Sequence, residues 1–183
     1  MPTTARLLDY GCGYGRTLAE LRDAGWRNAL GVDFSGEMIA RGRAEHPDLD
    51  LRRIDRVRLG EADGAFDVAL LFAVLTTIPD EAEQDAVMAE LRRLVRPGGL
   101  LYLSDYPLQA GARHAERYAA GRARFGVEGA WTREDGGVFR HHPRERLRAL
   151  MDGFELIAER DIDARTMSGA PAIVVQMLGR RRS

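Results

Sequence analysis

The chain has 183 residues, of which 45% are apolar and 30% charged, and its net charge is −1. These values are typical of one soluble globular domain over residues 1–183, and they give no electrostatic reason to expect a nucleic acid or a membrane as partner. Because all 27 basic residues are arginine, a lysine Schiff base or lysine general base is excluded. The single cysteine, Cys12, excludes a disulfide framework and a cysteine metal cluster, predicts no metal site, and fits a cytoplasmic location.

The first predicted element is a strand over residues 5–10 that opens into a glycine-rich turn. Gly11, Gly13 and Gly15 occupy alternate positions in this turn. Glycine adopts positive φ easily and lets a ligand approach bare backbone, and a helix predicted over 16–24 offers free amides at its N-terminus. The turn is therefore predicted to bind a ligand.

A second predicted strand, over residues 29–33, indicates which ligand. It ends in Asp33, roughly 20 residues after the turn, where a carboxylate can accept from both ribose hydroxyls of a nucleoside. In the dinucleotide pattern G-x-G-x-x-G the third glycine comes one residue later than Gly15, and Arg16 stands at that place here. The spacing therefore disfavours a nicotinamide dinucleotide.

Strand and helix patterns continue to alternate, which is typical of a parallel sheet covered on both faces. Ser35 is predicted to cap one helix, and Asp80 a second over 80–95 that the Pro-Gly-Gly sequence at 97–99 ends. Pro143 is predicted to begin a third helix. Further strands are predicted over residues 49–54, 66–72, 99–105, 154–161 and 172–178.

The segment 107–142 is explained least by periodicity. We predict a helix over roughly 112–125 in it, and a hairpin in which Trp131 and Phe139 flank a turn at 135–137. A long excursion from the carboxyl end of a central strand lies over the mouth of an α/β site. The segment is therefore predicted to be a substrate lid, with an ordinary packing insertion as the alternative.

Five blocks follow one another along the chain: Asp9-x-Gly-x-Gly-x-Gly15, Gly31-Val-Asp-Phe-Ser-Gly-Glu-Met38, Ile54-Asp55, residues 66–80 and residues 91–105. Together they resemble the cofactor site of class I S-adenosylmethionine-dependent methyltransferases. The resemblance implies an α/β, Rossmann-like, doubly wound sheet of seven strands, mostly parallel with an antiparallel edge strand. It also implies S-adenosylmethionine as the cofactor and methyl transfer as the reaction.

The resemblance assigns cofactor contacts to residues at the carboxyl ends of the first four strands. They are Asp9, Gly11, Cys12, Gly13, Asp33, Phe34, Met38, Asp55, Arg56, Phe72 and Ala73. It implies that Asp9 reaches the methionine amino end, that Asp33 takes the ribose hydroxyls, and that Phe34 and Met38 pack on the adenine. For Asp33 the alternative is a helix cap, and for Met38 it is a place in the core.

The same resemblance places Asp55 at the adenine amino group, with the Arg56 amide nearby, and residues 72–73 along the methionine arm. Surface ion pairing within the arginine-rich stretch 52–56 is the alternative for Asp55. Cys12 is predicted to fill the turn and not to act as a nucleophile, because nothing near it in sequence would lower its pKa.

The methyl group of a sulfonium is already activated, so the protein has to align the acceptor and, where needed, remove its proton. The candidate groups for this are His141, His142, Tyr106 and Asp105. A histidine beside Pro143 has helix capping as its alternative. His46 and His114 are predicted to lie on the surface.

Departures from the family pattern reduce the range of possible methyl acceptors. No Asn-Pro-Pro-Tyr-like tetrad follows the fourth strand, which disfavours amino-group methylation of nucleic acids, and Thr76-Thr77 replaces a histidine common in small-molecule members. The N-terminal helices that commonly cap the cofactor are missing from this chain. We therefore expect that the lid or a neighbouring subunit of a homodimer takes their place, or that the site is unusually open.

The distribution of charge along the chain indicates the charge of the methyl acceptor. Residues 107–148 hold nine arginines against five acids, which favours an anionic acceptor. We therefore expect methyl transfer to an oxygen or nitrogen of a small molecule. A protein or tRNA methyltransferase, or a non-catalytic S-adenosylmethionine-binding scaffold, stays open as an alternative.

Overall fold

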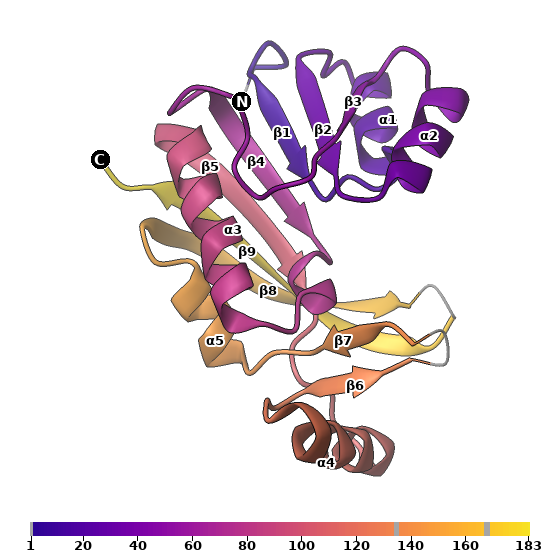
Figure 1. Ribbon diagram of the computed structural model, residues 1–183. Helices are drawn as coiled ribbons and strands as arrows, with labels where there is room; N and C mark the ends of the chain where they lie inside the picture. Colours follow the sequence, from indigo (N-terminus) through magenta and orange to yellow (C-terminus); the bar gives the residue numbers. More distant parts are fainter. Residues whose placement is uncertain (1, 134–135, 167–168) are drawn as a thin grey trace.

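The computed structural model describes residues 2–133, 136–166 and 169–183 (Figure 1). Its main sheet contains β1 (Leu7–Tyr10), β2 (Ala29–Asp33), β3 (Asp50–Arg53), β4 (Phe66–Phe72), β5 (Val95–Asp105), β8 (Phe154–Arg165) and β9 (Pro171–Arg181). The strand order is β3-β2-β1-β4-β5-β9-β8. The pairs from β3 to β5 are parallel, whereas β9 runs antiparallel to both β5 and β8. The predicted seven-stranded, mostly parallel sheet with antiparallel pairing at one edge is confirmed.

Helices pack on both faces of this sheet (Figure 1). They are α1 (Arg16–Asp23), α2 (Gly36–Glu45), α3 (Glu81–Leu94) and α5 (Arg144–Leu150), and a short 3-10 turn, η1 (Leu75–Thr77), follows β4. Leu18 of α1 and Ile39 of α2 are buried against one face, and Leu91 of α3 and Leu147 of α5 against the other. Among the residues that the structure describes, none of the helices is both long and apolar enough to cross a membrane.

The predicted helix caps of α2 and α3 are present. Ser35 Oγ accepts from Met38 N at 3.2 Å, and an Asp80 carboxylate oxygen accepts from Glu83 N at 2.9 Å. The predicted end of α3 is wrong, because the helix stops at Leu94 and the Pro-Gly-Gly sequence lies within β5. Val95, a buried β-branched residue, already has extended dihedral angles and pairs with β4.

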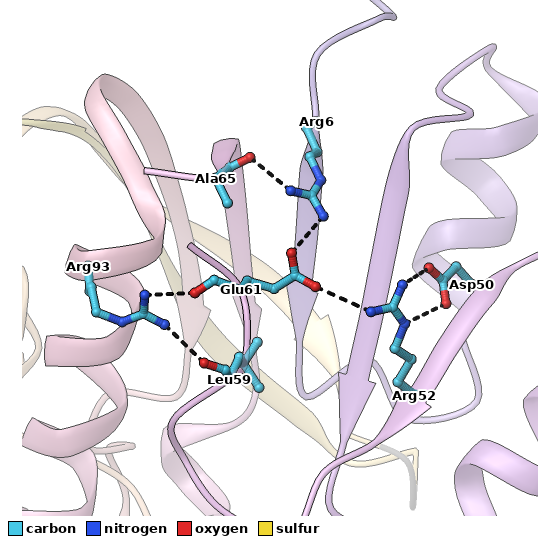
Figure 2. Close-up of polar contacts among 7 residues, drawn as sticks. All are labelled: Arg6, Asp50, Arg52, Leu59, Glu61, Ala65 and Arg93. Carbon is cyan, nitrogen blue, oxygen red and sulfur yellow. Dashed lines mark hydrogen bonds and ion pairs between the residues drawn. The ribbon is translucent and has the colours of Figure 1, made fainter. Parts of the chain in front are cut away.

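The connection from β3 to β4 has no helix among the described residues and is held by arginines instead. Figure 2 shows Glu61 accepting hydrogen bonds from Arg6 at 2.8 Å and from Arg52 at 3.2 Å. Arg93 of α3 donates to the carbonyls of Glu61 at 2.8 Å and of Leu59 at 3.2 Å (Figure 2). Arg52 of β3, Arg93 of α3 and Arg6, which directly precedes β1, therefore fix this connection through polar contacts.

The segment 107–142 forms a small unit beyond the carboxyl end of β5 (Figure 1). It contains α4 (Ala112–Phe125) and the hairpin of β6 (Ala130–Thr132) and β7 (Val138–Arg140). The helix has the predicted bounds and Trp131 pairs with Phe139 as predicted, while Asp135 of the predicted turn lies outside the described residues. A Cβ at Gly121 of α4 would lie 1.5 Å from the Ala130 carbonyl oxygen, so the helix backbone packs directly on β6.

Candidate functional site

The glycine turn joins β1 to α1 and leaves open space in front of its backbone. Gly11, Gly13 and Gly15 have φ values of 81°, 56° and 83°, in the left-handed region that favours glycine. A Cβ added at Gly11 would lie 2.3 Å from a methyl carbon of Val74, whereas a Cβ at Gly13 would meet nothing within 4 Å. Gly13 therefore presents bare backbone to open space, as the prediction of a ligand-binding turn requires.

Asp33 ends β2 and connects the glycine turn to α2. One carboxylate oxygen accepts from Gly13 N and the other from Ser35 N, both at 2.8 Å. The helix cap itself is Ser35, whose hydroxyl accepts from Met38 N. Because a carboxylate has about four acceptor positions, two stay available for ribose hydroxyls.

Asp9 is a buried acid at the end of β1. Its side chain is 3% exposed, and among the described residues no group donates a hydrogen bond to it. Burial, and next the nearby Asp33 carboxylate, raise the pKa of Asp9 to about 7, with Arg16 acting in the opposite direction. Burial and the same two acids also raise the pKa of the Cys12 thiol, which keeps it un-ionised.

Two large apolar side chains lie exposed beside Asp33. Phe34 is 47% and Met38 38% exposed, so Met38 is not in the core. Asp55 and Arg56 follow β3 and are exposed as well. The alternative for Asp55 was an ion pair with a neighbouring arginine. No such pair is present in the described part of the chain, and Arg52 pairs with Asp50 and Glu61 instead.

The end of β4 is strained next to the glycine turn. Ala73 has φ 55°, a left-handed conformation that no other described non-glycine residue adopts, and its N–H donates to the Ser104 carbonyl at 2.7 Å. Such strain gathers at ligand-binding sites. Phe72 packs edge-on against Tyr102, with ring centroids 5.1 Å apart. The predicted cofactor residues thus gather at the carboxyl ends of β1, β2, β3 and β4.

His141 lies in a cluster of aromatic side chains beyond β5, and we call Tyr106, His114, Tyr118, Trp131 and His141 the aromatic cluster. Tyr106 stacks on His141 at 5.3 Å and 22°, and Trp131 meets it edge-on at 4.4 Å and 70°. The Tyr118 hydroxyl is 2.6 Å from His141 Nδ1. Burial first, and then His114, His142 and Arg117, lower the pKa of His141 to about 3.

His142 is fully buried and turned away from solvent. Its Nε2 lies 2.8 Å from the Gln84 side-chain nitrogen, which also donates to the Ile78 carbonyl at 2.6 Å. Its Nδ1 is buried without a partner among the described residues. Burial and the neighbouring Arg140 and Arg146 lower its pKa to about 4. An acceptor has no route to His142 in this structure, which argues against its predicted catalytic role.

Asp105 and Tyr106 have different positions relative to solvent. Asp105 is fully buried and accepts from Tyr106 N at 2.7 Å and Thr76 N at 3.3 Å. Burial raises the pKa of Asp105 to about 7. It therefore connects β5 to η1 and is not placed to act as a base. Burial, and next the Asp105 carboxylate, raise the pKa of the half-buried Tyr106.

His114 was predicted to lie on the surface, but its ring belongs to the aromatic cluster. It lies in the first turn of α4, with ring centroids 5.9 Å from Tyr118 and 6.3 Å from His141. Its Nδ1 is 3.1 Å from the Ala110 carbonyl. The spacing of four between His114 and Tyr118 on one helix face is the signal that could have placed them together.

Comparison with known proteins gives the family. A family model described as a methyltransferase domain matches residues 2–159. The demethylmenaquinone methyltransferase of Beutenbergia cavernae is 36% identical over 102 residues, which cover 55% of this chain and 40% of that protein. The 27-O-demethylrifamycin SV methyltransferase of Amycolatopsis mediterranei is 33% identical over 109 residues, or 56% of this chain and 39% of that one. The matched region spans about two fifths of the length of these relatives.

Among solved structures, a SAM-dependent methyltransferase of Methanosarcina mazei superposes with a TM-score of 0.93 at 22% identity. The superposition covers 100% of this chain and 94% of that one. This likeness shows a shared fold over the whole described chain. The family model spans most of the sequence, from β1 into β8. Together these comparisons confirm the predicted class I methyltransferase and agree with S-adenosylmethionine as its cofactor. The chain belongs to the methyltransferase-domain family.

Proposed function

We propose that this chain transfers a methyl group from S-adenosylmethionine to an oxygen or nitrogen of a small-molecule acceptor, bound under residues 107–142. One observation carries the cofactor half of this proposal. Asp9 is a buried carboxyl with no donor from the described residues, and it lies beside a second acid at an open glycine turn. Burying an unpaired carboxyl is costly, so this site favours a cationic ligand.

The cofactor fits these residues group by group. Its ammonium group matches the Asp9 carboxyl, and its ribose hydroxyls match the free acceptor positions of Asp33. Phe34 and Met38 supply exposed apolar surface for the adenine, and Asp55, which has no ion-pair partner among the described residues, supplies an acceptor for its amino group. When bound, the cofactor supplies a methyl group made electrophilic by the sulfonium charge. The task left to this chain is to align an acceptor with that methyl group.

The acceptor half is supported by the aromatic cluster. Flat rings of Tyr106, Trp131 and His141 offer a surface that suits a planar molecule. Both curated relatives described above have names that specify small molecules, a demethylmenaquinone and a demethylrifamycin. These observations favour a small-molecule acceptor over a protein or a tRNA.

The arginine excess supports an anionic acceptor at Arg117. Among the described residues, Arg140, Arg144, Arg146 and Arg148 form ion pairs with acids, whereas Arg113, Arg117, Arg122 and Arg124 have no acidic partner. Of these four, Arg117 is the one that lies against the aromatic cluster, with its guanidinium carbon 5.2 Å from the centre of the Trp131 ring. An acceptor carboxylate is therefore proposed to bind at Arg117.

Calorimetry and mass spectrometry test the two halves separately. We expect S-adenosylhomocysteine to bind and NAD not to bind, and a metabolite library with S-adenosylmethionine to yield a product heavier by one methyl group. Methyl transfer only to added protein or tRNA would refute the small-molecule acceptor. Cofactor binding without any transfer would favour the non-catalytic scaffold.

Hydrogen exchange tests the lid. We expect amides of α4 to gain protection when S-adenosylhomocysteine and acceptor are both bound, because lids belong to the least stable part of a fold. Amides of residues 88–94 in α3, beyond the contacts that Glu81 and Gln84 make with the 107–142 segment, serve as the reference. Equal protection of α4 in all states would identify residues 107–142 as a packing insertion.

A further inference from the structure

The protonation of His141 follows from a chain of two hydrogen bonds. The Gln109 backbone N–H lies 3.1 Å from the Tyr118 hydroxyl oxygen, which lies 2.6 Å from His141 Nδ1. A backbone N–H can only donate, so the Tyr118 oxygen is the acceptor in the first bond. The arrangement that uses the Tyr118 proton as well as its oxygen has the hydroxyl donating to His141 Nδ1. This arrangement favours the neutral imidazole with its proton on Nε2.

Gln109 is itself held firmly. Its side chain donates to the Ile173 carbonyl at 2.9 Å and accepts from Ile173 N at 2.7 Å. This pair joins the start of the 107–142 segment to β9. The backbone amide that orients Tyr118 is therefore anchored to the main sheet.

The Nε2 edge of His141 is free to meet a ligand. His141 Nε2 has no hydrogen-bond partner among the described residues, and it is still accessible to solvent. By contrast, His142 Nδ1 has neither a partner among these residues nor access to solvent. The rest of the His141 side chain is buried between Tyr106 and Trp131. One N–H donor is thus presented at the open edge of an otherwise enclosed ring.

His141 is neutral at physiological pH. The groups that face it are His114 and Arg117 of α4, His142 next in the chain, and the phenols of Tyr106 and Tyr118. Burial together with the first three of these groups lowers its pKa to about 3. A neutral ring with a proton on Nε2 and an occupied Nδ1 has no free lone pair for an acceptor's proton, so this state does not suit a general base.

We propose that His141 positions the methyl acceptor by donating its Nε2–H to a carbonyl or phenolate oxygen of a planar molecule, and that Tyr118 and Gln109 fix the tautomer that makes this possible. The inference rests on the proposed function for the identity of the ligand. It assigns His141 to acceptor recognition and replaces the general-base role expected from the sequence.

The tautomer is measured on the free protein, without any turnover. In two-bond nitrogen–proton correlation spectra of ¹⁵N-histidine-labelled protein, we expect His141, assigned through His141→Gln, to carry its proton on Nε2 from pH 8 down to pH 5. In Tyr118→Phe, which keeps the ring and removes the hydroxyl, both tautomers should appear. A proton on Nδ1, or protonation of both nitrogens near pH 6, would overturn the proposal.

Acceptor contact is tested with a matched pair of probes on the complex with S-adenosylhomocysteine. Acetophenone carries a carbonyl oxygen, and ethylbenzene has the same ring without it. We expect millimolar acetophenone to shift the His141 Nε2–H signal and ethylbenzene to leave it in place. Equal shifts, or none with either probe, would contradict the contact. This result does not depend on finding an acceptor that is methylated.

Kinetics with an acceptor from the metabolite screen separate donor from base. Gln keeps an N–H donor near the place of Nε2, so His141→Gln should keep KM within about 3-fold, whereas His141→Leu should raise KM on the order of 10-fold or more. His46→Gln, at the end of α2, is the control. Loss of kcat by roughly 10²-fold or more in both His141 variants, with a changed pH profile, would restore the base role. A screen without any acceptor refutes the proposed function, while the spectra still decide the state of His141.

Discussion

Replacing Asp33 by Ala removes two kinds of contact at once. The first is the pair of hydrogen bonds by which the carboxylate holds Gly13 N and Ser35 N, both at 2.8 Å. The second is the proposed contact with the ribose hydroxyls of the cofactor. Both contribute to affinity, because a loosened glycine turn no longer presents the backbone of Gly13 in one position.

The magnitude follows from hydrogen bonds to a charged acceptor. Leaving the ribose hydroxyls unpaired costs about 1–3 kcal/mol, which is roughly a 5- to 150-fold rise in Kd. The two lost backbone bonds should lower the free energy of unfolding by about 2 kcal/mol, since the site is only partly buried. Asp33→Asn keeps one acceptor oxygen, so we expect its Kd to rise less than that of the alanine variant.

Calorimetry with S-adenosylhomocysteine gives these constants, and a pair of nucleosides separates the two effects. The parent protein should bind adenosine more tightly than 2′,3′-dideoxyadenosine, and Asp33→Ala should no longer distinguish them. Asp48→Ala, which removes an exposed acid paired with Arg22, is the control. If Asp33→Ala binds the cofactor product normally, or still prefers adenosine, Asp33 does not contact the ribose.

Three further predictions follow from the same geometry. Ala73→Gly relieves a left-handed conformation and should raise the free energy of unfolding by about 0.5–1 kcal/mol in urea titration, and a loss of stability would show that φ 55° carries no strain. Gly121→Ala forces α4 off the Ala130 carbonyl and should lower turnover while cofactor affinity by calorimetry stays unchanged. Asp9 has a folded-state pKa raised from 3.8 to about 7, so the folded protein keeps a proton that the unfolded chain loses, and stability should fall as pH rises from about 4 to 7. In thermal melts, Asp9→Asn should weaken this pH dependence and raise the melting temperature at pH 8. The same variant should bind the cofactor more weakly. A melting temperature at pH 8 below that of the parent protein would refute the reasoning.

The parts of the fold that were predicted correctly depend on local signals. The strands at residues 29–33 and 66–72 have the predicted bounds because each is a short apolar run between turn residues. The caps Ser35 and Asp80 were predicted because N-cap chemistry acts within three residues. The backbone conformation of the glycine turn was predicted because the spacing of the three glycines indicates where positive φ is needed.

The parts that were missed depend on contacts between distant residues. The connection from β3 to β4 is fixed by Arg6, Arg52 and Arg93, which come from three elements, and no periodicity marks such a network. The surroundings of the two histidines depend on the same kind of contact. His142 is enclosed by Gln84 of α3, and the tautomer of His141 depends on Tyr118, 23 residues earlier. Sequence identifies titratable residues, but their burial and partners decide what they do.

Asp9 and Asp105 show how far such context changes the meaning of one residue type. Each is a buried acid in the last positions of a parallel strand, and burial raises both pKa values to about 7. Asp105 accepts from two backbone amides, those of Tyr106 and Thr76, and it is closed to solvent. Asp9 accepts none from the described residues, and the charge that affects its pKa most is that of a second acid, Asp33. An unpaired buried carboxyl is costly, and a cationic ligand would offset this cost. That difference, more than the shared pKa direction, supports the proposal that Asp9 belongs to the binding site, whereas Asp105 holds η1 to β5.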